Sequence, residues 1–329
     1  MALLFRPSNP GDAPAIRALC ERVLAVPAGS PVLSEAHMRW KYWQPWPYWQ
    51  GSRGFVLLQG TQLVAHAGVV PLRYTYNSQP RTLVQLLDWA ADPKHVGAGV
   101  VLLKRIASMA DGVLNVRGSS DTQRILKPLG FRSLGDTQQY ALAAQPSAAA
   151  SAERGVTIRV HEQSRFAALD HPLTDVVSSQ QQVVPLRCRE QIEAWLACPV
   201  AHTQYCEVLT GDHLVGCFLV SYCPGQARLA DVWANAEVPE AWRAVIEVAV
   251  QQACQQASAT EIVCQTNERD CAQALRACGF VVTGSDPLSI LASQAVLPSS
   301  AQLRHHLLDS DLAYLHHGAP ERWLPQSRL

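Results

Sequence analysis

The sequence predicts two α/β domains in tandem, each of the α+β kind, with a mixed, mostly antiparallel sheet flanked by helices. The 329 residues exceed what one hydrophobic core usually serves. Hydrophobic residues make up 48% of the chain and charged residues 16%, which is enough apolar material for two cores. The order of expected strands and helices is similar on either side of a central segment rich in alanine and serine.

Residues 1–143 form the first expected domain. Apolar side chains recur on one helical face at Ile16, Leu19 and Val23, and Gly60-Thr61 separates two strand-like runs as a hairpin turn. The near-continuous apolar run 83–91 is typical of a central strand. The expected order is strand 3–6, helices 10–24 and 34–42, strands 54–59, 62–72 and 83–91, helix 100–110, strand 113–116, helix 121–129 and strands over 131–142.

Residues 144–155 are expected to link the domains, because they are rich in alanine and serine and lack large apolar side chains. The second domain, 156–296, follows, and residues 297–329 form a tail. The expected elements of the second domain are strands 205–209, 213–222 and 227–234, helix 240–256, strand 261–265 and helix 269–278.

A short signature occurs once in each half of the chain. A helix ends in Leu129-Gly130-Phe131 in the first half and in Cys278-Gly279-Phe280 in the second. In both, glycine closes the helix and phenylalanine begins the next strand. The two phenylalanines are one domain length apart (280 − 131 = 149 residues), so we interpret the halves as a divergent duplication.

Charge and hydropathy argue against several classes of partner. The 27 basic and 27 acidic side chains balance, which leaves no electrostatic footprint for nucleic acid or an anionic membrane. The N-terminal apolar run is too short for a signal peptide, and no run approaches the roughly 20 apolar residues that span a bilayer. We expect a cytoplasmic protein that binds no nucleic acid and no membrane.

Cysteine and histidine patterns predict no metal site. None of the ten cysteines forms a C-x-x-C pair, which excludes zinc-ribbon and thioredoxin-like interpretations and favours buried free thiols. The adjacent histidines His305-His306 and His316-His317 point to opposite faces of a strand, so neither pair serves one ion well.

The segment from Asp88 to Val100 carries the most chemical information. A buried strand leads into a loop with two glycines, Gly97 and Gly99, and a helix follows directly. That order presents free backbone N–H groups and the positive end of a helix to an anion such as a pyrophosphate, although a plain tight turn would also use these glycines. The Rossmann pattern needs a third glycine where Leu102 stands, and the Walker pattern is absent.

This segment resembles the acyl-CoA motif of GNAT (Gcn5-related N-acetyltransferase) enzymes, Q/R-x-x-G-x-G/A after the fourth strand. Here it reads K-H-V-G-A-G over residues 94–99, with lysine in place of glutamine or arginine. The helix before Gly130-Phe131 is similar to a later motif of the family. Segments 40–42 and 64–72 also resemble GNAT-type proteins often encoded with polysaccharide-biosynthesis genes. The resemblance covers the first domain well and the second in outline.

The resemblance implies acetyl-CoA or another acyl-CoA as the cofactor, and transfer of the acyl group to a small-molecule amine or an amino sugar. The main chain at the end of the strand would pair with pantetheine, and the glycine loop would bind the pyrophosphate. The implied cofactor-binding residues are Trp89, Ala90, Ala91, Lys94, His95, Val96, Gly97, Ala98, Gly99 and Val100.

In this family the amine attacks the thioester directly, and a base on the fourth strand removes its proton. Asp88 matches that position, although a carboxylate that fixes a neighbouring loop is an equal alternative. His66 is a second candidate base, against the alternative of a core histidine. Leu126 stands where the family commonly carries a tyrosine acid, so Tyr140 on a later strand substitutes only if the fold delivers it.

The implied acceptor contacts come from two places. Trp40 and Tyr42 belong to an aromatic cluster after the first helix, where GNAT proteins form an acceptor wall; a core plug or an interface between domains is the alternative. Asp309 and Asp311, in the D-S-D of the tail, resemble the closing segment of the polysaccharide-associated proteins.

The second domain departs from the family at the glycine loop. Residues 235–240 hold the corresponding place without a glycine and with two glutamates, which repel a pyrophosphate. We therefore expect acyl-CoA binding in the first domain only. Two rival functions remain: an aminoacyl-tRNA-dependent transferase, which the neutral charge argues against, and a non-catalytic binding or scaffold protein that has kept the fold.

Overall fold

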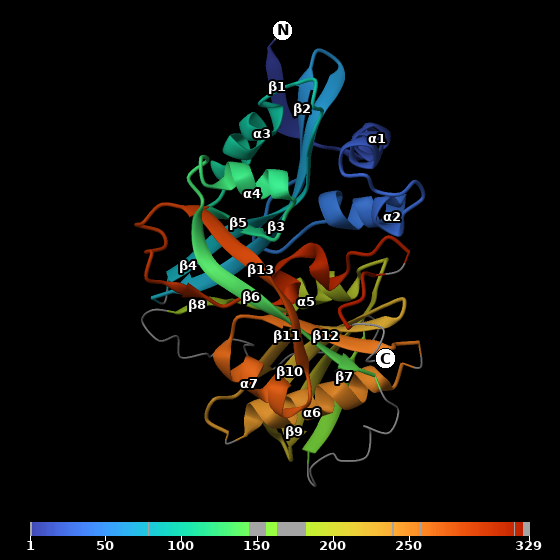
Figure 1. Cartoon of the computed structure of the whole chain (residues 1–329), viewed down its shortest axis with the longest axis vertical. Helices are drawn as coiled ribbons and strands as arrows, with labels where there is room; N and C mark the ends of the chain where they lie inside the picture. Colours follow the sequence, from blue (N-terminus) through green and yellow to red (C-terminus); the bar gives the residue numbers. More distant parts are fainter. Residues whose placement is uncertain are drawn as a thin grey trace. The chain divides into compact units, whose positions relative to one another are not determined.

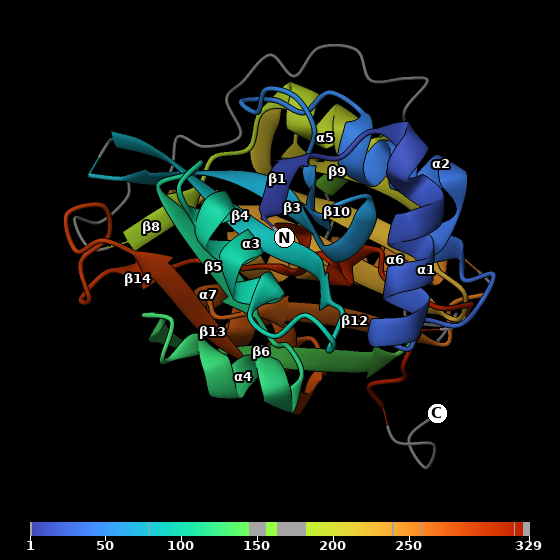
Figure 2. The same cartoon turned by 90° about the horizontal axis from the view of Figure 1, so that it is seen from above.

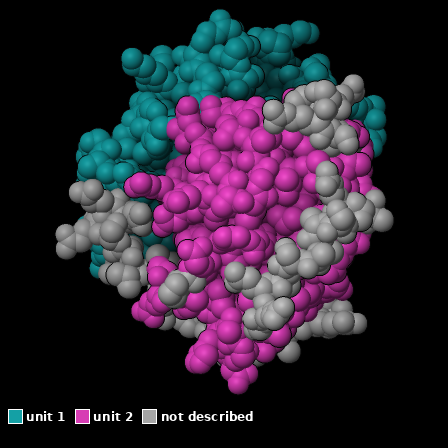
Figure 3. All heavy atoms as spheres, turned by 60° about the horizontal axis from the view of Figure 1, so that its bottom comes forward, with its two compact units in different colours: residues 1–135, 177–186, 287–303 teal, residues 136–176, 187–286, 304–329 magenta. Residues whose placement is uncertain are grey.

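The structure is a computed structural model that describes residues 2–77, 79–144, 156–162, 182–238, 240–256, 258–318 and 320–324. The chain divides into two compact units, which Figure 3 shows in different colours. Unit 1 comprises Met1–Gly135, Val177–Leu186 and Pro287–Leu303, and unit 2 comprises Asp136–Val176, Arg187–Asp286 and Arg304–Leu329.

These units differ from the domains predicted at 1–143 and 156–296, because two strands are divided between them. The later part of β6 (Arg132–Ala143) pairs with β12 (Glu261–Thr266) in unit 2. The later part of β13 (Val281–Ala292) pairs with β5 (Gly112–Val116) in unit 1. Each half of the sequence thus supplies part of a strand to the sheet of the other unit. The predicted linker, 144–155, lies outside the described residues except for Ala144.

Unit 1 is a mixed sheet with helices on both faces. Its other strands are β1 (Leu3–Pro7), β2 (Gly54–Gln59), β3 (Gln62–Tyr76), β4 (Gln79–Ala91), β8 (Gln182–Pro185) and β14 (Gln302–Leu303). The helices are η1 (Pro10–Asp12), α1 (Ala13–Val23), η2 (Pro31–Leu33), α2 (Glu35–Met38), the π-helical turn η3 (Arg39–Trp43), α3 (Ala98–Ala107) and α4 (Ser120–Leu126).

The strand order of unit 1 is β1-β2-β3-β4-β5-β13, and the run from β3 to β13 can be followed in Figure 2. Within this sheet β4 and β5 run parallel, whereas the pairs β1–β2, β2–β3, β3–β4 and β5–β13 are antiparallel. Strand β8 pairs with the far end of β3 and with β14. Figure 1 shows α1 and α2 on one face of the sheet and α3 and α4 on the other.

Unit 2 repeats the plan of a mixed sheet packed against helices. Its other strands are β7 (Val156–His161), β9 (His202–Thr210), β10 (His213–Cys223) and β11 (Gln226–Ala234). Its helices are α5 (Arg189–Leu196), α6 (Ala241–Cys254), α7 (Arg269–Ala277), η5 (Leu307–Asp309) and η6 (Asp311–Ala313). The strand order is β6-β12-β11-β10-β9-β7, with β11 and β12 parallel. Helices α6 and α7 share one apolar core with the sheet.

The predicted fold class is confirmed, and the differences lie in individual elements. The helix predicted over 34–42 is divided, because α2 ends at Met38 and the chain continues in the wider turn η3. The strand predicted over 62–72 continues to Tyr76, where long-range pairing with β4 extends it. Pattern reasoning missed β7, β8 and α5. In the part of the chain that the structure describes, no helix is both long and apolar enough to cross a membrane.

Candidate active site

Strands β4 and β5 separate within unit 1. Their parallel register covers only residues 83–85 of β4 and 112–114 of β5. Beyond this point β4 continues to Ala91, which still pairs with Ala65 of β3. From Leu86 onward, the edge of β4 turned away from β3 therefore has no strand partner among the described residues. Backbone N–H and C=O groups on such an edge seek partners elsewhere, as in strand addition by a ligand.

A β-bulge interrupts β4 at Asp88. The register with β3 shifts between His66, which faces Ala90, and Gly68, which faces Leu87. Asp88 has a φ of 45°, a left-handed conformation that costs a non-glycine residue about 1–2 kcal/mol. Bulges of this kind redirect side chains and are frequent beside active sites.

The Asp88 carboxylate is engaged by two neighbours. The ammonium group of Lys41 lies 2.5 Å from it, and the hydroxyl of Tyr42 donates a hydrogen bond at 2.5 Å. The Lys41 side chain is 2% exposed and that of Asp88 is 10% exposed. Burial alone would raise the pKa of Asp88, but the charge of Lys41 and the two hydrogen bonds outweigh it and lower the pKa to about 2. The carboxylate is therefore ionised and weakly basic at neutral pH.

Two facing glycines make room for the Tyr42 ring. Gly54 of β2 and Gly68 of β3 are register partners, and both lie against this ring. A Cβ on Gly68 would lie only 2.6 Å from Cε1 of Tyr42, closer than carbon atoms approach. Because neither glycine has a side chain, the Tyr42 ring lies directly against β2 and β3, and its hydroxyl reaches Asp88 at the bulge.

His66 also contacts the ring of Tyr42. The two rings meet edge to face with 4.9 Å between their centroids, and Nδ1 of His66 is 3.1 Å from the carbonyl oxygen of Phe55. Its Nε2 has no hydrogen-bond partner within the described ranges. Burial lowers the pKa of His66 to about 4, so the ring is neutral at physiological pH. The structure thus gathers both candidate bases around Tyr42.

Helix α3 follows the bulge after a short loop. Ala98, Leu102 and Ile106 recur on its buried face, which packs on β2, β3 and β4. Gly97 caps the helix with a φ of 84°, and an added Cβ there would meet nothing within 4 Å. At Gly99, by contrast, a Cβ would lie 3.2 Å from that of Ala91. The first glycine therefore serves the backbone conformation and the second serves close packing against β4.

The start of α3 presents backbone donors. The N–H groups of Gly99 and Val100 have no hydrogen-bond acceptor among the residues that the structure describes. Val96 at the tip of the loop is 97% exposed, so the approach to these donors is open. The indole N–H of Trp89 donates to the Gly99 carbonyl at 3.1 Å and ties the helix start to β4. Free donors at the positive end of a helix suit a phosphate or pyrophosphate.

The implied cofactor residues therefore meet in one region of unit 1. Trp89, Ala90 and Ala91 lie on the unpartnered stretch of β4, and residues 94–100 form the loop and the first turn of α3. Lys94 is exposed and His95 half-buried in this loop, where a cation can approach an anionic ligand.

The expected acid is not supplied by this region. Leu126 is buried in the core of unit 1 at the end of α4. Tyr140 belongs to the core of unit 2, where its hydroxyl donates to Gln138 at 2.6 Å and the guanidinium of Arg276 lies 5.5 Å from its ring. Burial raises the pKa of Tyr140. Tyr140 and Asp88 thus lie in different units.

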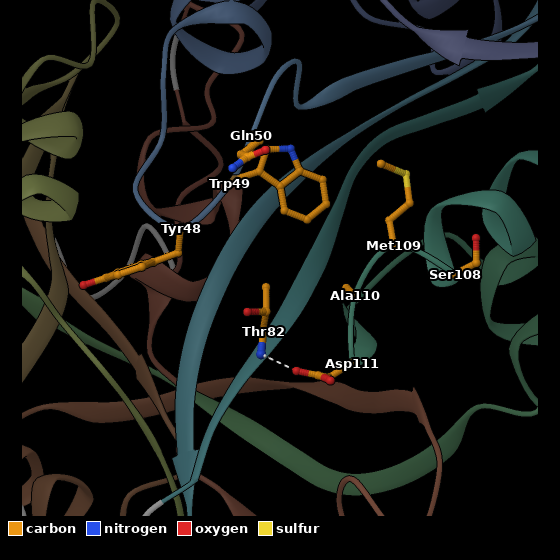
Figure 4. Close-up of a pocket in the computed structure, with 8 residues that line it drawn as sticks. All are labelled: Tyr48, Trp49, Gln50, Thr82, Ser108, Met109, Ala110 and Asp111. Carbon is orange, nitrogen blue, oxygen red and sulfur yellow. Dashed lines mark hydrogen bonds between the residues drawn. The ribbon is translucent and has the colours of Figure 1, made fainter.

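The aromatic cluster is mostly internal. Trp40 and Tyr42 are 3% and 0% exposed, so their rings contact protein in this conformation. Tyr48 is 53% exposed, and it contributes to an open hollow of about 520 Å³ shown in Figure 4. That hollow lies by Thr82, about 20 Å of extended strand away from Asp88. Its lining residues are Tyr48, Trp49, Gln50, Thr82, Ser108, Met109, Ala110 and Asp111.

The two aspartates of the tail lie in unit 2. Asp309 is fully buried, and its carboxylate lies 2.8 Å from the guanidinium of Arg187. Asp311 begins η6 and is partly exposed. No group of three or more histidine, cysteine or acidic side chains suited to a metal occurs among the described residues.

Lys41 is the residue that sequence reasoning missed. The signal was present, because a lysine between Trp40 and Tyr42 is unusual in a stretch of buried aromatic residues. A buried lysine requires a carboxylate partner, and Asp88 is the acid of the neighbouring apolar strand.

Neither protein-family models nor curated proteins match the sequence. Solved structures match the fold. A GCN5-related N-acetyltransferase from Kribbella flavida gives a TM-score of 0.60 at 12% identity, covering 89% of this chain and 72% of that one. A probable N-acyltransferase of unknown function from Enterococcus faecalis gives 0.58 at 8% identity, covering 88% and 72%. A tandem GNAT protein from the clavulanic acid biosynthesis pathway gives 0.55 at 10% identity, covering 88% and 98%.

The chain therefore has the GNAT fold, as the sequence resemblance implied. One matched structure is a tandem GNAT protein, and here β11, β12 and α6 of unit 2 repeat the arrangement of β4, β5 and α3 of unit 1.

Proposed function

We propose that the protein is an acyl-CoA-dependent N-acyltransferase whose unit 1 binds acetyl-CoA or another acyl-CoA. The acyl group passes to the amine of a small molecule or an amino sugar. The observation that carries this proposal is a combination of two features. The β4 edge at residues 86–91 has no strand partner, and the N–H groups of Gly99 and Val100, shortly after it in the chain, have no acceptor among the described residues. Together they offer backbone hydrogen bonds to an extended amide chain and an anion site at its end.

The residues of unit 1 bind and orient in this proposal. The N–H groups at the start of α3 hold the pyrophosphate, assisted by Lys94 and His95, and the β4 backbone near Trp89 pairs with the pantetheine arm. Acyl-CoA supplies an activated thioester. The amine nitrogen forms a bond to the acyl carbon, the bond from that carbon to sulfur breaks, and CoA leaves as the thiolate and takes up a proton.

The proton of the attacking amine passes to water rather than to Asp88 in this proposal. With a pKa of about 2, the carboxylate has little affinity for a proton at neutral pH. Asp88, together with Lys41 and Tyr42, instead keeps β4 bent at the bulge. The thiolate also takes its proton from water, because Leu126 stands where a tyrosine acid is expected. The value of kcat/KM should then rise with pH until the acceptor amine itself is deprotonated.

Calorimetric titration of the purified chain with acetyl-CoA and with CoA tests the cofactor site. We expect micromolar binding that weakens roughly 100-fold, or about 2.7 kcal/mol, in Gly97→Trp. Gly211→Trp is the matched control, since Gly211 also has a positive φ and open surroundings but lies in the β9–β10 turn of unit 2. No binding of either compound to the wild-type chain would refute the proposal and favour the scaffold interpretation.

Transfer itself is tested by incubating the chain with radiolabelled acetyl-CoA and a panel of amines and amino sugars. Release of free thiol should match acetyl incorporation one to one, and Gly97→Trp should abolish both. Thiol release that is the same with and without every amine would show hydrolysis instead of transfer.

A further inference from the structure

Strands β11 and β12 of unit 2 separate in the same way as β4 and β5 of unit 1. Their parallel register covers residues 226–229 and 261–264 only, and β11 continues to Ala234. A bulge again interrupts the longer strand, because the register with β10 shifts between Leu219 and Val220. Unit 2 thus has the same separation of parallel strands that leaves the β4 edge without a strand partner in unit 1.

In unit 2 this opening is occupied by residues 304–315 of the chain itself. Helix η5 packs against both β11 and β12, and the red C-terminal segment can be seen beside these strands in Figure 1. His306 forms an antiparallel bridge with Thr266 at the end of β12. The guanidinium of Arg304 donates to the Val232 carbonyl at 2.9 Å, a backbone acceptor on the stretch of β11 that β12 leaves.

Buried charges hold the middle of the segment. Arg187 lies 2.7 Å from the carboxylate of Asp231 on β11 and 2.8 Å from that of Asp309. Asp309 also accepts a hydrogen bond from the His306 N–H at 3.0 Å. Arg187 therefore bridges the bulged strand to the segment, and removing it would leave two carboxylates without their shared cation.

Both ends of the segment are also fixed. Arg228 of β11 donates to the carbonyl groups of Leu312 at 2.6 Å and Leu315 at 2.9 Å. At the other end, the guanidinium of Arg304 lies 5.3 Å from the ring centroid of Trp242, in the first turn of α6. Leu307 and Leu308, between these ends, are 0% and 1% exposed.

We infer that residues 304–315 permanently occupy the opening between β11 and β12 of unit 2, which is called the unit 2 cleft below. Acyl-CoA would otherwise bind in this place. The segment contacts the backbone of β11 through Arg304 and is joined to Asp231 of β11 by Arg187. It pairs with Thr266 of β12, and Arg304 lies against the Trp242 ring at the start of α6. Unit 2 therefore admits no acyl-CoA, and the chain binds one acyl-CoA, at unit 1. The stoichiometry rests on the proposed function, whereas the occupied cleft does not.

Hydrogen exchange on the full chain, with and without saturating acetyl-CoA, tests the occupied cleft of unit 2 separately from acyl-CoA binding at unit 1. Slow exchange is expected at 305–310, where the N–H groups of His305 and His306 donate to Asn267 and Asp309. Acetyl-CoA should add protection at 89–100 and none at 230–242. Fast exchange at 305–310, or acetyl-CoA protection at 230–242, would overturn the inference. Absence of protection anywhere by acetyl-CoA would instead refute the proposed function.

A paired variant tests whether Arg304 holds the segment. Arg304→Met removes its contacts with Val232 and Trp242, and exchange at 305–310 should quicken at least tenfold. Arg322→Met is the control, because Arg322 is exposed and lies in the same tail. Equal exchange in both variants, at the wild-type rate, would show that Arg304 does not hold the segment in the cleft. Calorimetry on the wild-type chain should give one equivalent of acetyl-CoA, and two equivalents would contradict the inference.

Discussion

Units 1 and 2 each place a largely buried acid at the same distance before the residue that caps the next helix. Asp88 lies nine residues before Gly97, which caps α3, and Asp231 lies nine residues before Glu240, which caps α6 (97 − 88 = 240 − 231 = 9). Asp88 pairs with Lys41 and Asp231 pairs with Arg187. The acid–cation pair is thus present in both units, although the lysine is replaced by arginine.

The units differ at the start of the helix that follows this acid, α3 in unit 1 and α6 in unit 2. Gly97 and Glu240 both have a positive φ, 84° and 59°, so the backbone path is kept while the glycine is lost. Trp242 stands where Gly99 stands in unit 1, two residues after the cap (99 − 97 = 242 − 240 = 2). A glutamate and a tryptophan at the helix start repel and obstruct an anion. The acid–cation pair is thus common to both units, whereas the glycines that leave the helix start open occur in unit 1 only, as the proposed function requires.

Arg187→Met should have the largest effect on stability, because it leaves both Asp231 and Asp309 without their shared cation. We expect a loss of about 5 kcal/mol in the free energy of unfolding, the upper end for a broken buried pair. Urea denaturation followed by circular dichroism measures it. Arg189→Met is the control, since Arg189 forms an exposed pair with Glu193 within α5, and it should leave the transition midpoint unchanged. Similar midpoints for both variants would contradict the structural role of Arg187.

Lys41→Met should destabilise unit 1 by about 3–4 kcal/mol, because the Asp88 carboxylate would remain buried without its cation. Lys41→Arg should recover most of this loss, because unit 2 uses arginine at the corresponding pair. Urea denaturation again measures both, with the exposed Lys104→Met as the control. If Lys41→Arg is as unstable as Lys41→Met, the two pairs are not equivalent.

Acid should weaken each unit through buried histidines. Burial lowers the pKa of His66 in unit 1 to about 4 and that of His306 in unit 2 to about 3, below the ordinary 6.5. The unfolded chain binds more protons in this range, so stability is fully present above pH 6.5 and falls as the pH is lowered toward these values. Between pH 7.5 and 4.5 we expect a loss of roughly 2–3 kcal/mol per histidine. Urea denaturation at both values should show a smaller loss in His66→Gln than in the wild type or in the exposed His213→Gln.

Substitutions of the two capping residues, Gly97 and Glu240, should have the smallest effect on stability. Gly97→Ala is expected to cost about 1 kcal/mol from its left-handed φ alone, since no atom lies near the new methyl group. Glu240→Gly should relieve that strain in unit 2 and change stability by no more than about 1 kcal/mol. Thermal melts measure both variants. Acetyl-CoA titration of Glu240→Gly should still give one equivalent, because residues 304–315 occupy the cleft; a second equivalent would sink the inference drawn from that segment.

The sequence by itself determined the local features of the site. An apolar strand, a loop with Gly97 and Gly99, and a helix with Leu102 and Ile106 on one face lie within a short stretch of chain. Their geometry depends on backbone conformation and periodicity, which neighbouring residues set. The two-part α/β plan was predictable for the same reason, since each half repeats the same local patterns.

Only the tertiary structure decided which distant residues meet. The pairing of Asp88 with Lys41 and the place of Tyr140 in unit 2 depend on sheet register and on burial. The division of β6 and β13 between the units likewise arises from pairing with β12 and β5. Residues 304–315 lie in the segment predicted as a tail, yet Arg187 joins Asp309 of this segment to Asp231 of β11. Buried charges select their partners across the folded chain, so local patterns do not reveal them.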